Sequence, residues 1–196
     1  MDVEKCIKER RSIRRYSDKK VSLSDILDII NCARYAPSSG NLQNWCFIIV
    51  KDKKTKSEIV DACLGQDWMH DAPVFIVICS NREKIASYYE KHKNKYSIQN
   101  CALAAQNLML KAHSLGLGTC FVSAFSKPQL QRILNIAPGW EPEVVIPLGY
   151  PLERPKSKRS TMENYTFFET FGNRKADTSF WPIAKTLSKL FSKFKK

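Results

Sequence analysis

Four short apolar runs predict the strands of one sheet. Residues 45–50 and 74–79 are apolar without alternation, a pattern typical of strands buried on both faces in the middle of a sheet. The first of these strands is predicted over 45–51. Residues 119–123 and 143–147 predict two further strands. No run approaches the roughly 20 residues that are needed to span a bilayer, so the pattern predicts no transmembrane helix.

Between these strands, apolar residues recur mostly at the spacing of a helix. Ser22, with Asp25 three residues later, predicts a helix start that resembles a capping box. The apolar face of this helix is expected to contain Ile26, Leu27, Ile30 and Ala33. Residues 97–114 predict the most apolar helix, which ends at Gly116. Shorter helices are predicted around residues 3–7, over 54–63 and from 126 to before Pro138.

Several helices around a few buried strands favour an α+β fold over a regular βαβ alternation. The chain has 196 residues, of which 43% are hydrophobic, and this size and composition predict one folded domain. The N-terminus lacks the features of a secretory signal. We therefore expect a cytoplasmic protein.

The net charge of +13 is the first unusual property of the composition. Basic residues are in excess over the whole chain and most strongly over residues 173–196. Such a charge favours an anionic partner. Nucleic acid, a membrane surface, a phosphorylated cofactor and mere solubility all remain open on charge alone.

Several common kinds of site are excluded by spacing. The seven cysteines contain no Cys-x-x-Cys pair, and no histidine belongs to His-Glu-x-x-His, so we expect no metal site. The Gly116-x-Gly118 pair continues to Phe121 where a dinucleotide fingerprint needs glycine, and no glycine precedes lysine. Side chains must therefore hold any phosphate.

Two polar segments are candidates for that task. Residues 10–15 hold four arginines and Ser12, and guanidinium groups bind phosphate oxygens in pairs. A solvated basic turn is the alternative interpretation of this segment. Residues 37–44 place hydroxyls and amides directly before a buried strand, where they could hydrogen-bond the edge of a flat heterocycle.

These segments belong to a series of motifs that resembles the nitroreductase family of FMN-dependent oxidoreductases. The motifs follow one another in the family's order over about residues 1–172. They are RRSIR at 10–14, PSSGNLQNW at 37–45, GQ at 65–66 before AP at 72–73, YSIQ at 96–99, GLGTC at 116–120 with AF at 124–125, and PLGYP at 147–151. Two positions depart from the family pattern, because Asn44 replaces a usual proline and Asn100 a common aspartate.

The resemblance implies an α+β fold with a mostly antiparallel central sheet flanked by helices, and FMN at a homodimer interface. Arg10 and Ser12, with Lys158 or Arg159, would hold the FMN phosphate, and Arg14 would lie toward the ribityl or pyrimidine end. Ser38, Ser39 and Asn41 would come from the partner subunit, while Gln66 would lie near the pyrimidine edge. The stretches 122–124 and 147–149 would line the ring. The complete set of implied cofactor-binding residues is Arg10, Arg11, Ser12, Arg14, Pro37, Ser38, Ser39, Asn41, Gln43, Gln66, Val122, Ser123, Ala124, Pro147, Leu148, Gly149, Lys158 and Arg159.

The resemblance also implies the reaction. NAD(P)H would give hydride to FMN, and a small electron-poor acceptor such as a nitroaromatic or a quinone would take the electrons in a ping-pong cycle. FMN would carry the chemistry, so no side chain is assigned as a catalytic acid or base. Two alternatives stay open: reductive dehalogenation or other flavin chemistry on the same scaffold, and a non-catalytic basic protein that binds a membrane or nucleic acid.

Two further segments are candidates for roles outside the cofactor site. Residues 82–95 are a candidate for a lid over the substrate, without a diagnostic motif. Residues 173–196 form a predicted basic amphipathic extension of the domain 1–172, with helical spacing of its apolar residues. This extension would dock on the partner subunit or lie on an anionic membrane. Nucleic acid is not expected as a partner, because the aromatic residues lie mostly in predicted strands and loops.

Overall fold

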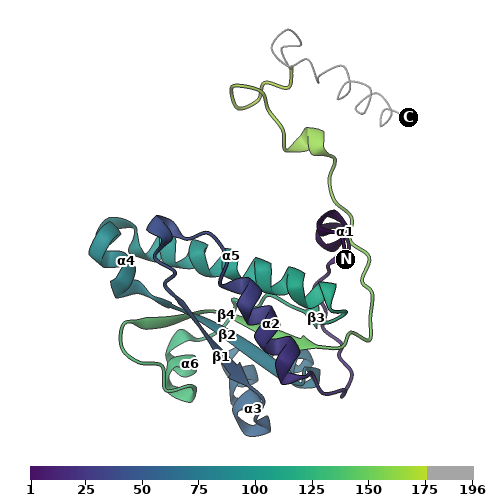
Figure 1. Ribbon diagram of the computed structural model, residues 1–196, viewed down its shortest axis with the longest axis vertical. Helices are drawn as coiled ribbons and strands as arrows, with labels where there is room; N and C mark the ends of the chain where they lie inside the picture. Colours follow the sequence, from purple (N-terminus) through teal and green to yellow (C-terminus); the bar gives the residue numbers. More distant parts are fainter. Residues whose placement is uncertain (176–196) are drawn as a thin grey trace. The chain divides into compact units, whose positions relative to one another are not determined.

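In the computed structural model, which describes residues 1–175, four strands form one antiparallel sheet in the order β1-β2-β4-β3 (Figure 1). The strands are β1 (Trp45–Val50), β2 (Val74–Asn81), β3 (Gly118–Thr119) and β4 (Trp140–Gly149). The helices are α1 (Val3–Glu9), α2 (Leu23–Ala33), α3 (Lys53–Ala62), α4 (Arg82–Tyr89), α5 (Lys93–Ser114) and α6 (Lys127–Ile133). This arrangement confirms the predicted α+β fold.

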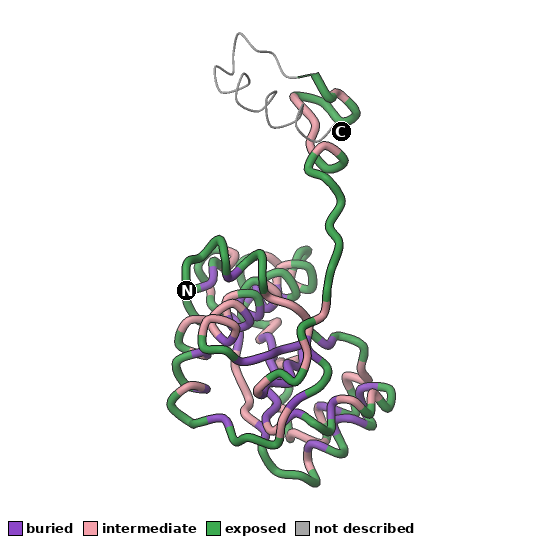
Figure 2. The backbone as a smooth tube through the Cα atoms, turned by 90° about the vertical axis from the view of Figure 1, so that its right-hand side faces the viewer, coloured by how far each residue is buried: buried purple, intermediate pink, exposed green. Residues whose placement is uncertain are grey.

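The central strand β2 is buried along nearly its whole length, as its unbroken apolar run predicts. Figure 2 shows buried segments gathered in the interior, with exposed segments around them. Val74, Ile76 and Ile78 belong to a core shared with α2 and α5. The alternating side chains belong to a second core that includes residues of α3 and α6. Because successive side chains of a strand point to opposite faces, one run of sequence supplies both cores.

The helix α2 begins where the sequence predicts, since the Ser22 hydroxyl accepts a hydrogen bond from Asp25 N at 3.0 Å. Its predicted apolar face was wrong at one position. Leu27 is 52% exposed, whereas Ile29 is completely buried. Residues 26, 29 and 33 follow the i, i+3, i+7 spacing of one helical stripe, and Leu27 lies outside that stripe.

Other boundaries differ from the predicted ones by a few residues. The helix α5 begins four residues earlier than expected, and α3 runs from Lys53 because the Asp52 carboxylate caps Thr55 N at 2.8 Å. The predicted strand 119–123 is reduced to β3 and one isolated bridge between Val122 and Val145. β4 is longer than predicted, because the polar residues at its start continue the pairing with β2.

The lid candidate 82–95 is helical throughout most of its length. It comprises α4, the short 3-10 helix η3 (Glu90–His92) and the first turn of α5. Tyr89 contacts Tyr96 edge to face, with ring centroids 5.3 Å apart. Two more 3-10 helices, η1 (Ser39–Asn41) and η2 (Asp67–Asp71), lie in loops that flank β1 and β2.

The chain divides into two units, the first of residues 1–155 and the second beginning at residue 156. Within the second unit the 3-10 helix η4 (Met162–Asn164) is followed by a turn in which Arg174 Nη1 donates to Glu163 O at 2.7 Å. The expected amphipathic helix of the basic extension lies outside the described residues. Over residues 1–175 no helix is long and apolar enough to cross a membrane.

Candidate functional site

Residues 10–16, which we call the arginine loop, are fixed to the sheet through their backbone. Ile13 N donates to Thr119 O at 2.9 Å, beside a parallel bridge between Ser12 and Thr119. At the end of the loop Ser17 N donates to Tyr150 O at 2.9 Å. The backbone therefore determines where the loop runs along the sheet.

Two glycines permit this close approach. A Cβ atom at Gly118 would lie 2.8 Å from Cγ1 of Ile13, and one at Gly149 would lie 2.6 Å from Cδ of Pro73. Gly118 and Gly149 face each other in the β3–β4 pair. Their missing side chains leave room for the arginine loop and for Tyr16, whose hydroxyl donates to Ile13 O at 2.5 Å.

A cavity of about 430 Å³ opens beside the arginine loop, at the C-terminal end of α5. Arg10, Arg11 and His113 line it, Arg154 adds a third guanidinium, and Glu9 and Glu153 add two carboxylates. Within residues 1–175, the buried Arg11 Nε and His113 Nε2 have no hydrogen-bond partner. Burial, assisted by the charges of Arg10 and Arg11 and opposed by Glu9, lowers the pKa of His113.

This donor set fits an anion such as a phosphate monoester. Guanidinium groups present several N–H donors in a fixed plane, and the Arg11 Nε donor is left unused by the protein around it. Arg11 Nη1 is already bound to Lys8 O at 2.6 Å, which fixes the direction of the guanidinium. The chemistry of the cavity therefore suits the phosphate that the sequence assigns to it.

Arg14 lies on the other side of the arginine loop, where it meets η2. Its guanidinium carbon is 5.6 Å from the ring centroid of Trp68. Gln66, just before η2, donates from Nε2 to Cys63 O at 2.9 Å and to Ala124 O at 3.4 Å. Ser123 and Ala124 are exposed. The structure thus joins Gln66 to the 122–124 stretch and places Arg14 over the neighbouring Trp68.

The remaining predicted residues of the sheet and the second unit lie in different surroundings. Val122, Pro147, Leu148 and Gly149 are buried, so their side chains belong to the core or to its edge. Only backbone groups of 147–149 could contact a ligand there. Lys158 and Arg159 belong to the second unit and are exposed, and Arg159 Nη1 donates to Ser157 Oγ.

Residues 37–44, which we call the amide loop, have a backbone that only certain residues adopt readily. Gly40, Asn41 and Gln43 have φ angles of 57°, 55° and 46°, in the left-handed region that glycine and asparagine tolerate best. The Ser38 hydroxyl accepts from Gln43 N at 3.0 Å, and Gln43 Nε2 donates to Asn41 Oδ1 at 3.2 Å. The loop is therefore closed by its own side chains.

The two departures from the family pattern are in contact with each other beneath this loop. Asn100 Nδ2 donates to Asn44 Oδ1 at 2.8 Å, and Asn100 Oδ1 accepts from Ser39 N at 3.0 Å. Asn44 Nδ2 in turn donates to Ser97 Oγ at 3.1 Å and to Asn81 O at 3.2 Å. Both asparagines are buried. Sequence reasoning missed their role as supports of the loop, although their joint departure from the pattern was a signal of it.

The amide loop and the arginine loop lie at different ends of α5. Pro37, Ser38 and Ser39 line a shallow groove of about 470 Å³ together with Asn100 and Leu103. The arginine-loop cavity includes His113. At a rise of about 1.5 Å per residue, Asn100 and His113 are roughly 20 Å apart along the helix axis. The two loops of one chain therefore line separate cavities.

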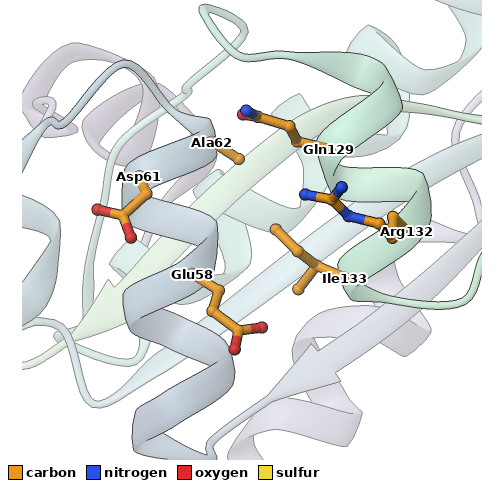
Figure 3. Close-up of a pocket in the computed structure, with 6 residues that line it drawn as sticks. All are labelled: Glu58, Asp61, Ala62, Gln129, Arg132 and Ile133. Atoms are coloured by element: carbon orange, nitrogen blue, oxygen red, sulfur yellow. The ribbon is translucent and has the colours of Figure 1, made fainter.

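A third cavity, of about 480 Å³, lies between α3 and α6 (Figure 3). Arg132 and Gln129 project from α6 toward α3, which carries Glu58 and Asp61. None of the residues that the sequence assigns to a cofactor lines this cavity.

Comparisons with known proteins agree with the fold and cover both loops. The model of the nitroreductase family matches residues 7–66 and 63–150. An FMN reductase [NAD(P)H] of Bacillus subtilis strain 168 is 34% identical over 199 residues, which cover 91% of this chain and 78% of the relative. An iodotyrosine deiodinase of Thermotoga neapolitana is 27% identical over 84% of this chain and 96% of its own length.

A solved structure gives the same result for the fold. The hypothetical oxidoreductase YcnD from Bacillus subtilis superimposes with a TM-score of 0.80 and 29% identity. The match covers 98% of this chain and 84% of that one.

Proposed function

Because the chain belongs to the nitroreductase family and is therefore an oxidoreductase, we propose that it binds FMN between two copies of itself. In this proposal NAD(P)H is the electron donor, and a small electron-poor molecule is the acceptor. A relative that is named as an FMN reductase [NAD(P)H] supports both the cofactor and the donor.

The separation of the two loops along α5 is the observation that carries the proposal. Each loop has the donors that one part of FMN requires: guanidinium groups for the phosphate, and hydroxyls and amides for a polar edge. The loops of one chain are roughly 20 Å apart along the axis of α5. A second copy of the chain, with its amide loop next to the first copy's arginine loop, would complete the site.

Different residues would contact different parts of the cofactor. Arg10, Arg11 and Ser12 would bind the phosphate, with Lys158 or Arg159 as a further cation. The partner's Ser38, Ser39 and Asn41 would contact the opposite part of the cofactor, beside Pro37 and Gln43. Gln66, the 122–124 stretch and the backbone of 147–149 would surround the ring system.

When bound, FMN supplies the chemistry of accepting and donating a hydride. The protein contributes binding, orientation and charge. Arg14 keeps a permanent positive charge near the ring-binding residues, where it would favour a reduced, anionic cofactor, and its position is fixed by Trp68 and by the bond from Arg14 N to Glu153 Oε1 at 2.6 Å. No side chain needs to act as an acid or base, and we propose that donor and acceptor bind in turn.

Nitroaromatics and quinones are the proposed acceptors. Reductive dehalogenation is the second candidate, since a relative at 27% identity is named as an iodotyrosine deiodinase. Anaerobic turnover with a nitroaromatic, a quinone and iodotyrosine, each at the same concentration, separates the two. Release of iodide at a rate above that of the other acceptors would favour the second candidate.

The visible absorption spectrum of the purified protein tests the proposal most simply. The protein is measured alone, after addition of FMN, and after anaerobic addition of NADH or NADPH. We expect a flavin spectrum at one FMN per chain that either nicotinamide bleaches. If FMN does not bind at that stoichiometry, the site assignments fail and a non-catalytic basic binding protein becomes the better interpretation.

A further inference from the structure

Cys46 of β1 and Cys79 of β2 face each other across the two strands. Asn81 N donates to Asn44 O at 2.7 Å, which makes Asn44 and Asn81 a hydrogen-bonded pair of the antiparallel ladder. The pair two residues further along, Cys46 and Cys79, is then of the same kind. Cα atoms in such pairs are about 5.5 Å apart, which falls within the range of Cα separations found in disulfides.

The side chains of the two cysteines are also directed toward each other. The Cys79 thiol donates a hydrogen bond to the sulfur of Cys46, and this bond holds the pKa of Cys46 below its usual value. The same bond, together with burial, raises the pKa of Cys79. The thiolate form is the nucleophile of thiol chemistry, so the two sulfurs are chemically unequal.

Cys46, whose pKa is lowered, is also the more exposed of the two cysteines. Cys46 is partly exposed on β1, an edge strand of the sheet, whereas Cys79 is completely buried. Burial raises the pKa of Cys63 to about 12, and it also raises that of Cys101 and Cys120. Cys46 is the one cysteine of the chain that combines partial exposure with a facing thiol. This combination is typical of oxidation-sensitive cysteine pairs.

We propose that Cys46 and Cys79 are a modification site at which hydrogen peroxide forms an intramolecular disulfide. The Cys46 thiolate attacks one oxygen of the peroxide, the O–O bond breaks, and hydroxide leaves as Cys46 becomes a sulfenic acid. Cys79 then attacks the Cys46 sulfur, the S–O bond breaks, and the second oxygen leaves as water once protonated. Two thiols and one peroxide give one disulfide and two waters.

The disulfide would join the edge strand covalently to the central strand. Cys46 lies two residues after Asn44, whose side chain supports the amide loop. Oxidation therefore acts next to the support of that loop. The modification depends only on the protein's own sulfurs and the peroxide, and it is independent of the cofactor assignment.

Peptide mapping of the full-length protein after treatment with hydrogen peroxide tests the proposal. Remaining thiols are alkylated in denaturant before digestion with trypsin. We expect a disulfide between the peptides 35–51 and 57–82, and loss of two of the seven thiols. Because peptide 57–82 contains both Cys63 and Cys79, the variant Cys63→Ser is the matched control, and it should keep the same link.

A second variant reports the first step separately. In Cys79→Ser the sulfenic acid at Cys46 has no facing thiol, so dimedone should label Cys46 there and should label the wild type much less. A wild-type protein that keeps all seven thiols, or in which Cys46 is oxidised to sulfenic or sulfinic acid without the link to Cys79, would overturn the proposal. So would a link that moves to Cys63. All of these outcomes are measured on the wild type or on Cys63→Ser. The test therefore does not depend on the folding of Cys79→Ser.

Discussion

The arginine loop and the amide loop are held in place by different kinds of hydrogen bond. Backbone hydrogen bonds to β3 and to the end of β4 join the arginine loop to the sheet, and Arg10 and Arg11 line a cavity beside it. In the amide loop two local backbone hydrogen bonds are supplemented by side chains: Ser38 and Gln43 close the loop, and the buried Asn44–Asn100 pair supports it from below. The arginine loop is a backbone segment paired with the sheet that presents charged side chains, and the amide loop is held by a network of polar side chains.

The difference predicts how each loop responds to substitution. Changing an arginine should remove binding without moving the arginine loop, because the backbone remains paired with the sheet. Changing a side chain under the amide loop should disturb its shape, because a buried donor or acceptor then loses its partner. Substitutions in the arginine loop should therefore reduce binding alone, and substitutions under the amide loop should also reduce stability.

The double variant Arg10→Gln and Arg11→Gln should have the largest effect. Hydrogen bonds to charged groups contribute about 1.5–3 kcal/mol each, so loss of two guanidinium groups should lower FMN affinity by roughly 100-fold to 10,000-fold. Urea unfolding should change little. Arg132→Gln, which removes one positive charge at the α3–α6 cavity (Figure 3), is the control and should leave FMN affinity unchanged. A loss per removed charge as large as that of the double variant would show that net charge alone matters.

Gly118→Ala tests the close packing of the arginine loop against β3. The added methyl group would lie 2.8 Å from Cγ1 of Ile13, and overpacking of this kind costs about 1–3 kcal/mol. Urea unfolding should show that loss, and FMN affinity should fall with it. Ile13→Val, which keeps the space at Gly118, should cost less. An alanine variant as stable as the wild type would contradict the close approach of the loop to β3.

Asn100→Asp should disturb the amide loop by about 1–2 kcal/mol, because an ionised carboxylate cannot donate to Asn44 Oδ1. The pKa of such a buried carboxyl is raised, so the protonated form, which can donate, returns at acidic pH. The stability deficit relative to wild type should therefore be largest at neutral pH and should shrink as pH falls. A deficit that is independent of pH would contradict the role of this hydrogen bond.

His113 should give the smallest effect. Its pKa is lowered in the folded protein, so the unfolded chain binds more protons, and the contribution of this residue to stability is lost as pH falls below about 6.5. Comparison of urea unfolding at pH 7.5 and pH 5.5 should show a smaller loss for His113→Gln than for the wild type. An equal loss in both proteins would exclude His113 as a source of this pH dependence.

The sequence predicted the parts of the fold that depend on hydrophobic spacing. The run 74–79 identifies the central strand, and Ser22 identifies the start of α2, because burial and capping are local requirements. The start of α5 was missed, since its first turn is polar and continues the helical segment α4–η3. The short β3 was overestimated, because pairing beyond Thr119 depends on a neighbour that is distant in sequence.

The candidate site was predictable only in part, for similar reasons. The arginine loop and the amide loop stand out by composition, but their separation along α5 depends on the tertiary fold. The support from Asn100 crosses from α5 to a loop far away in sequence. The burial of Leu148 and its neighbours in β4 likewise follows from the pairing of β4 with β2 and β3, which the motif itself does not contain.

We propose that each FMN site takes its arginine loop from one chain and its amide loop from the other. A heterodimer with Arg10→Gln and Arg11→Gln in one chain, and Ser39→Ala and Asn41→Gly in the other, tests it by FMN titration. Asn41→Gly removes the amide and keeps a residue that tolerates the φ of 55°. The account predicts one wild-type-like site per heterodimer, although each mutant homodimer binds weakly. A heterodimer without any such site would show that the two loops act within the same chain.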